Sequence, residues 1–432
     1  MGRPLSDSAD VVIVGAGKAG SQTALSLRAE GFEGSLTVLG DEDQLPYDRP
    51  PLSKEYLRGT YQDDDVLIRP RAFYEDNRID LQLGTPVDRL DTVGRSVELR
   101  DGRTIGYGEL VLATGSRARP LPVPGANLHG VLSLRSLDDA RRLKNDLSVA
   151  RSVVVIGGGF VGLEVAAAAA RDLSCQVTII EALPQLMSRT ALPETAEHMT
   201  EYHTSLGSRV LLGTTVTALR GDARGHVTAV LTSDGHVFDA DLVVFGIGAV
   251  PSIGPALNTG LDVRDGIRVD ESLRASAAHV WAVGDCAAFP SQRDGEVIRL
   301  ESVQNATDQA RAVATSIASG RPVAYRAVPW FWSDQGDTHV QTVGLTGSHD
   351  LTAVVGTPAD GSFSVLAFRG GAFLGADSVN ARGDHLALRR LLARAADDGR
   401  PTLTPQLCRS AGFDLKLFAR SVLTSGEQRA AD

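Results

Sequence analysis

The chain has 432 residues, a length that allows about three domains and excludes a single small binding module or a disulfide-stapled mini-protein. Its 43 Lys and Arg residues against 53 Asp and Glu residues give a formal net charge of −10, which argues against general affinity for nucleic acid or anionic membranes. No apolar stretch approaches the ~20 residues that span a bilayer, so we expect no membrane partner.

The first predicted element is a buried strand at residues 10–14, which leads directly into the run GAGKAG and a helix. In this setting the three glycines are typical of a dinucleotide-binding turn. Gly15 makes the tight turn, Gly17 lets the backbone approach a pyrophosphate, and Gly20 lets the helix pack on the strand. The helix N-terminus then faces the anion. An ordinary tight turn is the alternative for this unit taken alone.

Two further strands complete this first unit. The strand at 35–39 is followed by Asp41, where a carboxylate can accept hydrogen bonds from ribose hydroxyls. The strand at 110–112 ends on the small residues Ala113, Thr114 and Gly115, which let the chain pass close to a ligand. Prolines at positions 120, 122 and 124 then indicate a linker.

The same dinucleotide pattern occurs a second time. A strand at 152–156 leads into Gly157, Gly159 and Gly162, and then into an alanine-rich helix predicted over 163–171. Two complete units in one chain imply two bound dinucleotides. A protein that holds two dinucleotides usually passes electrons between them.

The strand that follows the second unit ends at Glu181. A carboxylate at this position accepts a hydrogen bond from a ribose 2′-OH and repels a 2′-phosphate. At about 4 Å and an effective dielectric constant near 20, this repulsion reaches about 4 kcal/mol per unit charge. We therefore expect NADH to be preferred over NADPH.

Later strands bring the chain back to the first unit. The strand at 242–245 runs on to Gly248, close to Pro251, and resembles the 110–115 segment. The strand that begins at Val280 ends in Gly284 and Asp285, and an Asp at the carboxyl end of a strand is placed to bind a sugar-alcohol hydroxyl. The second dinucleotide unit is therefore predicted to be inserted into the first.

From residue 326 the pattern changes to short strands, with a hairpin signal at Arg369-Gly-Gly371 and an amphipathic helix from about 384 to 396. The sequence thus predicts an α/β protein with two Rossmann-like dinucleotide-binding domains and a C-terminal α+β domain. We expect an FAD-binding domain over 1–118 and 248–325, an NAD-binding domain over 119–247, and the C-terminal domain over 326–432.

These features together resemble the glutathione-reductase-like flavoproteins, in which the first unit holds FAD and the inserted unit holds a nicotinamide cofactor. The runs LPYDRPPLSK at 45–54 and PWFWSDQ at 329–335 are similar to those of the NADH-dependent ferredoxin reductases of oxygenase systems, the putidaredoxin reductase type. One departure is Gly336-Asp337-Thr338, where relatives often carry bulkier residues.

The resemblance implies roles for single residues. Lys54 would lie beside the flavin ring, Glu164 would approach it near the nicotinamide, and Trp332 would stand where electrons leave. A buried ammonium would stabilise the negative charge that arrives with a hydride, while the carboxylate keeps that ammonium paired. Further implied flavin contacts are Ala19, Asp41, Arg49, Val87, Arg135, Asp285 and Val303. The alternatives are a surface role for Lys54, core packing for the tryptophans, and, for Glu164, a carboxylate in the first turn of a helix that is favoured by the helix dipole.

The cysteines exclude a sulfur relay of the kind found in disulfide reductases, because residues 42–62 contain none. Cys175, Cys286 and Cys408 are too scattered for a disulfide framework or a cysteine-based metal cluster, so we expect no metal site and a reducing, cytoplasmic location. Electrons must therefore leave the flavin for a separate carrier.

An iron–sulfur ferredoxin that serves a cytochrome P450 or a Rieske-type oxygenase is the expected partner. Ferredoxins are usually acidic, so an acidic reductase needs a local positive patch for docking. The candidates are Arg311, Arg69, Arg71, Arg389 and Arg390. The alternatives are a rubredoxin reductase, an NADH oxidase, or an NADH-switched interaction protein related to apoptosis-inducing factor.

Overall fold

The computed structural model describes residues 7–293, 295–394 and 402–424. The chain forms two compact units, each built from separate segments. Unit 1 comprises Met1–Arg49, Gln62–Arg117 and Ala249–Ala327, and unit 2 comprises Pro50–Tyr61, Ala118–Gly248 and Val328–Asp432. The division into three domains stays a prediction. Unit 2 holds most residues of both the predicted NAD-binding domain and the predicted C-terminal domain, together with Pro50–Tyr61.

A mixed sheet forms the centre of unit 1, with strand order β3-β2-β1-β6-β5-β4 and β19 paired with β6. Its parallel strands are rich in Val, Ile and Leu because both faces are covered, and β4 and β5 join it in antiparallel pairing. The strands are β1 (Ser8–Val14), β2 (Leu36–Leu39), β3 (Asp80–Gln82), β4 (Val87–Asp91), β5 (Ser96–Leu99), β6 (Thr104–Leu112) and β19 (Val280–Ala282).

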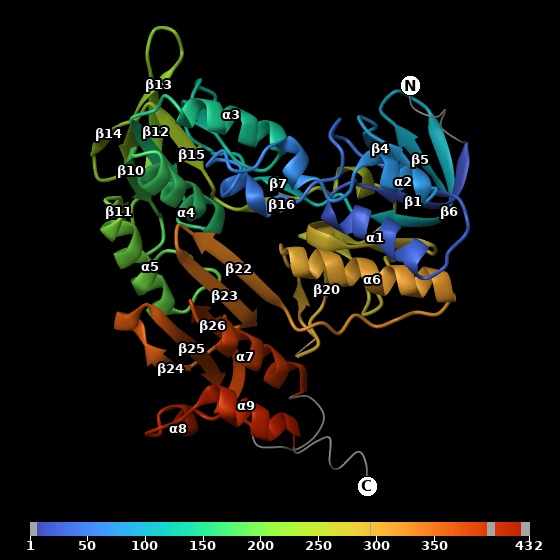
Figure 1. Cartoon of the computed structure of the whole chain (residues 1–432). Helices are drawn as coiled ribbons and strands as arrows, with labels where there is room; N and C mark the ends of the chain where they lie inside the picture. Colours follow the sequence, from blue (N-terminus) through green and yellow to red (C-terminus); the bar gives the residue numbers. More distant parts are fainter. Residues whose placement is uncertain (1–6, 294, 395–401, 425–432) are drawn as a thin grey trace. The chain divides into compact units, whose positions relative to one another are not determined.

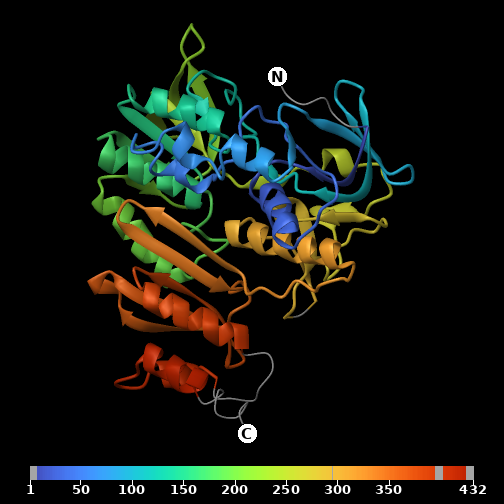
Figure 2. The ribbon, with the colours of Figure 1, turned by 45° about the vertical axis from the view of Figure 1, so that its right-hand side comes forward.

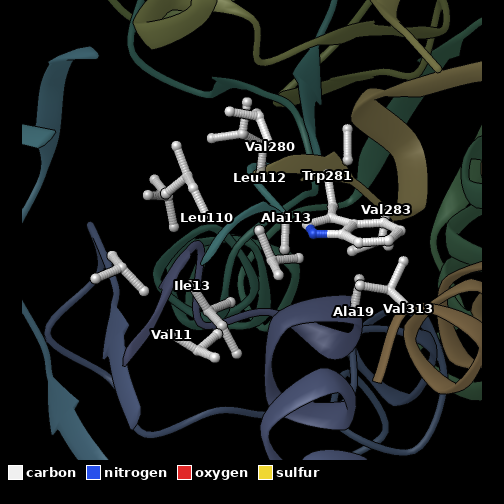
Figure 3. Packing of buried hydrophobic residues seen from close by; sticks show 14 of the residues in the cluster. Val11, Ile13, Ala19, Leu110, Leu112, Ala113, Val280, Trp281, Val283 and Val313 are labelled. Atoms are coloured by element: carbon white, nitrogen blue, oxygen red, sulfur yellow. The ribbon is translucent and has the colours of Figure 1, made fainter. Parts of the chain in front are cut away.

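Two long helices of unit 1, α1 (Lys18–Ala29) and α6 (Val303–Ser319), lie side by side (Figure 1). Ala19 from α1 and Val313 from α6 pack with strand residues such as Ile13 and Trp281 in one buried cluster (Figure 3). The remaining elements are α2 (Arg71–Asp76), β7 (Ser116–Ala118), β16 (Ala249–Pro251), β17 (Val263–Arg264), β18 (Gly266–Arg268), β20 (Ala287–Pro290) and β21 (Val297–Ile298).

A parallel sheet of order β11-β10-β9-β15-β8 lies in unit 2 and carries the second glycine turn. Its strands are β8 (Val131–Leu132), β9 (Ser152–Ile156), β10 (Gln176–Ile180), β11 (Arg209–Leu211) and β15 (Leu242–Phe245), and its helices are α3 (Leu137–Leu147), α4 (Phe160–Ala167) and α5 (Pro193–Ser205). A small antiparallel sheet follows, made of β12 (Val216–Gly221), β13 (Val227–Thr232) and β14 (Val237–Asp239).

The helix predicted over 163–171 was placed too late in the sequence. Helix α4 begins at Phe160, directly behind its N-cap Gly159, and a π-helical turn over Ala168–Asp172 follows it. The third glycine of the motif, Gly162, therefore lies inside the helix, where its missing side chain allows close packing on the turn below.

An antiparallel sheet of order β22-β23-β26-β25-β24 occupies the C-terminal part of unit 2, and helix α7 packs against β23 and β26 (Figure 2). The hairpin predicted at 369–371 is confirmed, because Gly370 and Gly371 join β25 to β26 with φ angles of +56° and +83°. The elements are β22 (Trp330–Gln335), β23 (Thr338–Gly344), β24 (Leu351–Thr357), β25 (Ser362–Arg369), β26 (Ala372–Val379), α7 (Arg382–Arg394), α8 (Pro405–Cys408) and α9 (Leu415–Thr424).

The predicted helix near 384–396 corresponds to α7, and its last two predicted residues lie outside the described part of the chain. Within the described ranges, no helix combines the length and the apolar character that a membrane crossing requires.

Candidate functional site

In the glycine turn between β1 and α1, the packing of the protein itself requires glycine at two positions but not at the third. Gly15 has a φ of +111°, and a Cβ atom on it would lie 2.2 Å from the Ala113 carbonyl oxygen. A Cβ on Gly20 would lie 1.8 Å from the Gly15 carbonyl oxygen, whereas a Cβ on Gly17 would meet nothing within 4 Å. The open space at the middle glycine fits the predicted approach of a pyrophosphate.

The second turn repeats this arrangement. Gly157 has a φ of +101°, and a Cβ there would lie 2.6 Å from the Gly246 carbonyl oxygen. A Cβ on Gly162 would lie 2.5 Å from the Gly157 carbonyl oxygen, while the nearest atom to a Cβ on Gly159 would be 3.7 Å away.

The helices behind both turns also start without a side-chain cap, at Gly17 and Gly159, whereas Ser136 and Ser302 cap α3 and α6. The amide groups of α1 and α4 are therefore available to an anion. Both turns fit a dinucleotide.

We expect Gly17→Ala and Gly20→Ala to separate ligand binding from folding. Gly17→Ala leaves the protein's own packing intact and should weaken FAD binding about tenfold, because the methyl group enters the space reserved for the pyrophosphate. Gly20→Ala should lower stability by about 1–3 kcal/mol through overpacking. Flavin titration and thermal unfolding measure the two effects. Equal loss of stability in both variants would contradict this assignment.

Segments far apart in the sequence meet beside the first turn at the carboxyl ends of the unit 1 strands. Because β6 lies between β1 and β19, the chain leaves β6 through Ala113, Thr114 and Gly115 next to the exit of β19 at Gly284 and Asp285. The Thr114 hydroxyl donates to the Ser252 carbonyl oxygen at 2.5 Å. The Ser116 hydroxyl donates to the Asp285 carboxylate at 2.7 Å, and the Gly284 amide donates to the Gln309 side chain at 2.7 Å.

The other predicted flavin contacts divide between the two units. In unit 1, Asp41 is exposed behind β2, Arg49 pairs with Glu42 at 2.8 Å, Val87 is buried at the start of β4, and Ala19 and Val303 lie in the first turns of α1 and α6. Unit 2 contains Lys54, Arg135 and Trp332, with Arg135 just before α3. The roles of these residues in binding FAD stay predictions.

Glu181, which we expect to read the nicotinamide ribose, is fixed beside the second turn. Its carboxylate accepts hydrogen bonds from the Gly158 amide at 2.6 Å and from the Leu183 amide at 2.7 Å. Gly248 has a φ of +105°, and its missing side chain leaves room for the guanidinium of Arg189. Arg189 lies in an exposed turn that precedes α5.

Lys54 and Glu164 are both buried and lie together in unit 2. Their side chains are 5% and 6% exposed, and Lys54 Nζ lies 3.3 Å from Glu164 Oε1. Lys54 Nζ also lies 3.4 Å from Asp334 Oδ2 and 5.9 Å from the centre of the Trp332 ring. The surface role for Lys54 is therefore wrong. The buried ammonium is held between two carboxylates.

Two serine hydroxyls complete the shell of Glu164. Ser53 donates to Oε2, and Ser333 donates to Oε1 at 2.6 Å. Burial raises the pKa of the Glu164 carboxyl above its usual value, although Lys54 and the two serine hydroxyls oppose the shift. This carboxyl can therefore hold a proton more readily than an exposed glutamate.

Asp334 has the opposite tendency. Burial acts to raise the pKa of its carboxyl, but a hydrogen bond with His339 and the charge of Lys54 outweigh burial and lower the pKa. Asp334 thus remains an anion beside Lys54.

Ser53, Ser333, Asp334 and His339 are the members of this cluster that the sequence prediction missed. The alternation of β22 carried a usable signal. Trp330 and Trp332 share one face, with ring centres 5.5 Å apart, and Phe331 points to the other face, where its ring lies 4.4 Å from that of Phe160. The same alternation sends Ser333 toward α4 with Phe331 and puts Asp334 with Trp332.

The arginines proposed for docking have varied surroundings. Arg69, Arg71, Arg311 and Arg390 are exposed. Arg311 lies 3.3 Å from Asp308, Arg69 lies over the Phe73 ring at 5.4 Å, and Arg389 lies over the Trp330 ring at 4.3 Å.

Comparisons with known proteins agree with this architecture. The family model "Pyridine nucleotide-disulphide oxidoreductase" matches residues 9–310, and the model "Reductase C-terminal" matches residues 330–416. Rhodocoxin reductase of Rhodococcus erythropolis is 45% identical over 94% of this chain and 93% of its own length.

Two solved structures extend the comparison. The ferredoxin reductase for the CYP199A2 system of Rhodopseudomonas palustris has a TM-score of 0.91 at 41% identity, covering 96% of this chain and 100% of its own. The covalent putidaredoxin reductase–putidaredoxin complex gives 0.90 at 36% identity, covering 97% and 99%. The chain therefore belongs to the pyridine nucleotide-disulphide oxidoreductase family and carries the Reductase C-terminal domain that follows it in the sequence.

Proposed function

We propose that this chain is an FAD-containing NADH:ferredoxin reductase that supplies electrons to a cytochrome P450 or a Rieske-type oxygenase. The observation that carries the proposal is the pairing of two dinucleotide turns with a buried ammonium, Lys54, and with no reactive thiol among the described residues. FAD, when bound, supplies the conversion between two-electron hydride chemistry and one-electron transfer.

The three cysteines support this proposal because their thiols are buried and poorly reactive. Cys175, Cys286 and Cys408 are all buried, and burial raises the pKa of each thiol above its usual value. Cys286 follows Asp285, but its Sγ donates to the Leu112 carbonyl oxygen at 3.4 Å. A thiol with a raised pKa forms little thiolate at neutral pH and is a poor redox relay.

The proposed division of labour follows the two turns. FAD is held by the first turn and the strand ends around it, with Asp41, Arg49, Val87, Arg135, Asp285 and Val303 as further contacts. NADH is held by the second turn, Glu181 and Gly248. Lys54 would stabilise negative charge on a bound flavin, Glu164 would keep Lys54 paired when no cofactor is bound, and Trp332 would lie at the electron exit.

The proposed partner is an iron–sulfur ferredoxin. Fast association with an acidic ferredoxin requires local positive charge, since the chain as a whole is acidic at −10. We propose that Arg69, Arg71, Arg311, Arg389 and Arg390 supply it.

The direct test is spectroscopic. The purified protein should be yellow and should be bleached by NADH, and it should reduce cytochrome c quickly only when a ferredoxin is added. Failure to bleach would overturn the proposal. NADH consumption without any protein acceptor would indicate an oxidase, and faster reduction of rubredoxin than of ferredoxin would indicate a rubredoxin reductase. Slow turnover with every acceptor, with an NADH-dependent change in oligomeric state, would indicate a switch.

We expect Glu181→Gln to relax the choice of nicotinamide. The amide keeps an oxygen that can accept from the Gly158 amide but removes the charge that repels a 2′-phosphate. The preference for NADH over NADPH in kcat/KM should fall about tenfold or more. Glu197→Gln, at an exposed position on α5, is the control and should keep the preference. An unchanged ratio in Glu181→Gln would contradict the assigned role.

A further inference from the structure

The buried Lys54 is joined to one half-exposed imidazole through a single carboxylate. Lys54 Nζ lies 3.4 Å from Asp334 Oδ2, and Asp334 Oδ1 is hydrogen-bonded to His339 Nδ1. The exposed fractions of the three side chains rise from 5% for Lys54 to 38% for Asp334 and 37% for His339. A continuous polar path therefore runs from the buried ammonium to water.

The hairpin fixes this path. Asp334 in β22 and His339 in β23 are directly opposite each other in the antiparallel register. The tight connection between the two strands passes through Gly336, whose φ of +64° suits a glycine. Cross-strand neighbours of this kind are held within reach of each other by the backbone ladder and need no flexible loop.

The proposed function creates a need for such a path. One NADH and two oxidised ferredoxins give NAD⁺, two reduced ferredoxins and one proton, so each turnover must deliver one proton to water. An imidazole has two ring nitrogens, so a histidine can take up a proton on one nitrogen and release one from the other.

We propose that Asp334 and His339 form a proton outlet, which carries protons from the buried Lys54–Glu164 pair to water. This inference rests on the proposed function, because that reaction is the source of the proton. Lys54 Nζ gives a proton to the Asp334 carboxylate, which briefly becomes neutral and passes it to Nδ1 of the His339 tautomer that carries its hydrogen on Nε2. His339 then releases the Nε2 proton to water, and exchange with water returns the remaining ring hydrogen from Nδ1 to Nε2. The proton that the proposed reaction releases restores the Lys54 ammonium. No electrons move in this sequence, and the net change is one proton carried outward.

The neighbouring charged groups leave His339 as the carrier. Glu164 faces Lys54 from α4 and is hydrogen-bonded to the buried Ser53 and Ser333. A proton that passed to Glu164 would therefore move toward buried groups and not toward water. Burial lowers the pKa of His385 on α7 to about 4, and the nearby charges of Arg389 and His339 add to this effect. His385 is therefore neutral at pH 7 and does not compete for the proton.

The scarcity of lysine makes a direct test practical. The chain contains only four lysines, at positions 18, 54, 144 and 416, so ¹⁵N-lysine labelling gives few ammonium signals. In the full chain as purified, NMR measures how fast the hydrogens of the Lys54 ammonium exchange with water. His339→Ala and Asp334→Asn should each slow this exchange by about tenfold or more.

Chemical rescue separates proton transfer from a structural role. Free imidazole should restore the exchange rate in His339→Ala, because the vacated position is open to solvent, and it should not restore the rate in Asp334→Asn. His349→Ala is the matched control, since the His349 ring is hydrogen-bonded to the Thr346 carbonyl oxygen in the loop after β23 and has no hydrogen bond or ion pair with Asp334 or Lys54 among the described residues. An unchanged rate in His339→Ala and His339→Gln, or a loss that imidazole does not repair, would overturn the outlet.

A turnover measurement distinguishes this inference from the proposed function. With NADH and a ferredoxin, a pH-indicator dye should report proton release that His339→Ala delays by about tenfold. Proton release at the wild-type rate in that variant would count against the outlet alone. If NADH does not reduce the wild-type protein, the proposed function fails, while the Lys54 exchange rates still decide whether the path carries protons.

Discussion

Lys54→Met is expected to slow the bleaching of bound flavin by NADH about 100-fold. Methionine fills a similar volume but carries no charge, so the negative charge that arrives with the hydride loses its ammonium partner. The buried Glu164 can tolerate the change by taking up a proton, because burial already raises the pKa of its carboxyl. Stopped-flow absorbance of the flavin band measures the rate.

The control for this prediction is Lys144→Met. Lys144 is half-buried and lies over the Tyr56 ring at 4.7 Å, but no carboxylate pairs with it among the ion pairs found in the described residues. This variant should bleach at the wild-type rate. Equal rates in Lys54→Met and the wild type would remove Lys54 from the hydride-transfer step, and a colourless Lys54→Met protein would instead indicate a role in holding FAD.

Features that depend on neighbouring residues could be predicted from the sequence. The glycine turns, the strands before them, the hairpin at 369–371 and the alternation of the tryptophans in β22 all follow from local spacing. The start of α4 was missed because the third glycine of the turn was counted as loop, although its function is to pack inside the helix.

The shell of Glu164 could not be predicted in this way. Ser53 is 111 residues before Glu164 and Ser333 is 169 residues after it, so only the folded chain brings the three together. The family resemblance marked the segments that contain both serines, but it drew attention to Lys54 and Trp332. Charge counting has the same limit, since it cannot show that Arg389 lies over the ring of Trp330.

A second buried carboxyl, Asp377, also depends on long-range contacts. It lies on β26 and accepts a hydrogen bond from the Leu192 amide at the start of α5 at 2.6 Å. Among the described residues, neither its Oδ1 nor the Oε2 of Glu194 has a hydrogen-bond partner of good geometry, although both atoms are buried. Burial, reinforced by the charge of Glu194, raises the pKa of Asp377 from 3.8 to about 7.

Asp377→Asn is expected to stabilise the protein at alkaline pH. A carboxyl whose pKa is raised on folding binds its proton more tightly in the native state, so the wild type should lose stability as the pH rises from about 4 to about 7. A shift of about 3 units bounds this loss at about 4 kcal/mol. Asparagine keeps an acceptor for the Leu192 amide and carries no charge. Thermal unfolding at pH 4 and pH 8 should therefore show similar stabilities of the wild type and the variant at pH 4, and a more stable variant at pH 8.

The control is Asp360→Asn, at an exposed carboxylate between β24 and β25, which should be as stable as the wild type at both pH values. A wild-type stability that does not change between pH 4 and pH 8 would contradict the role assigned to Asp377.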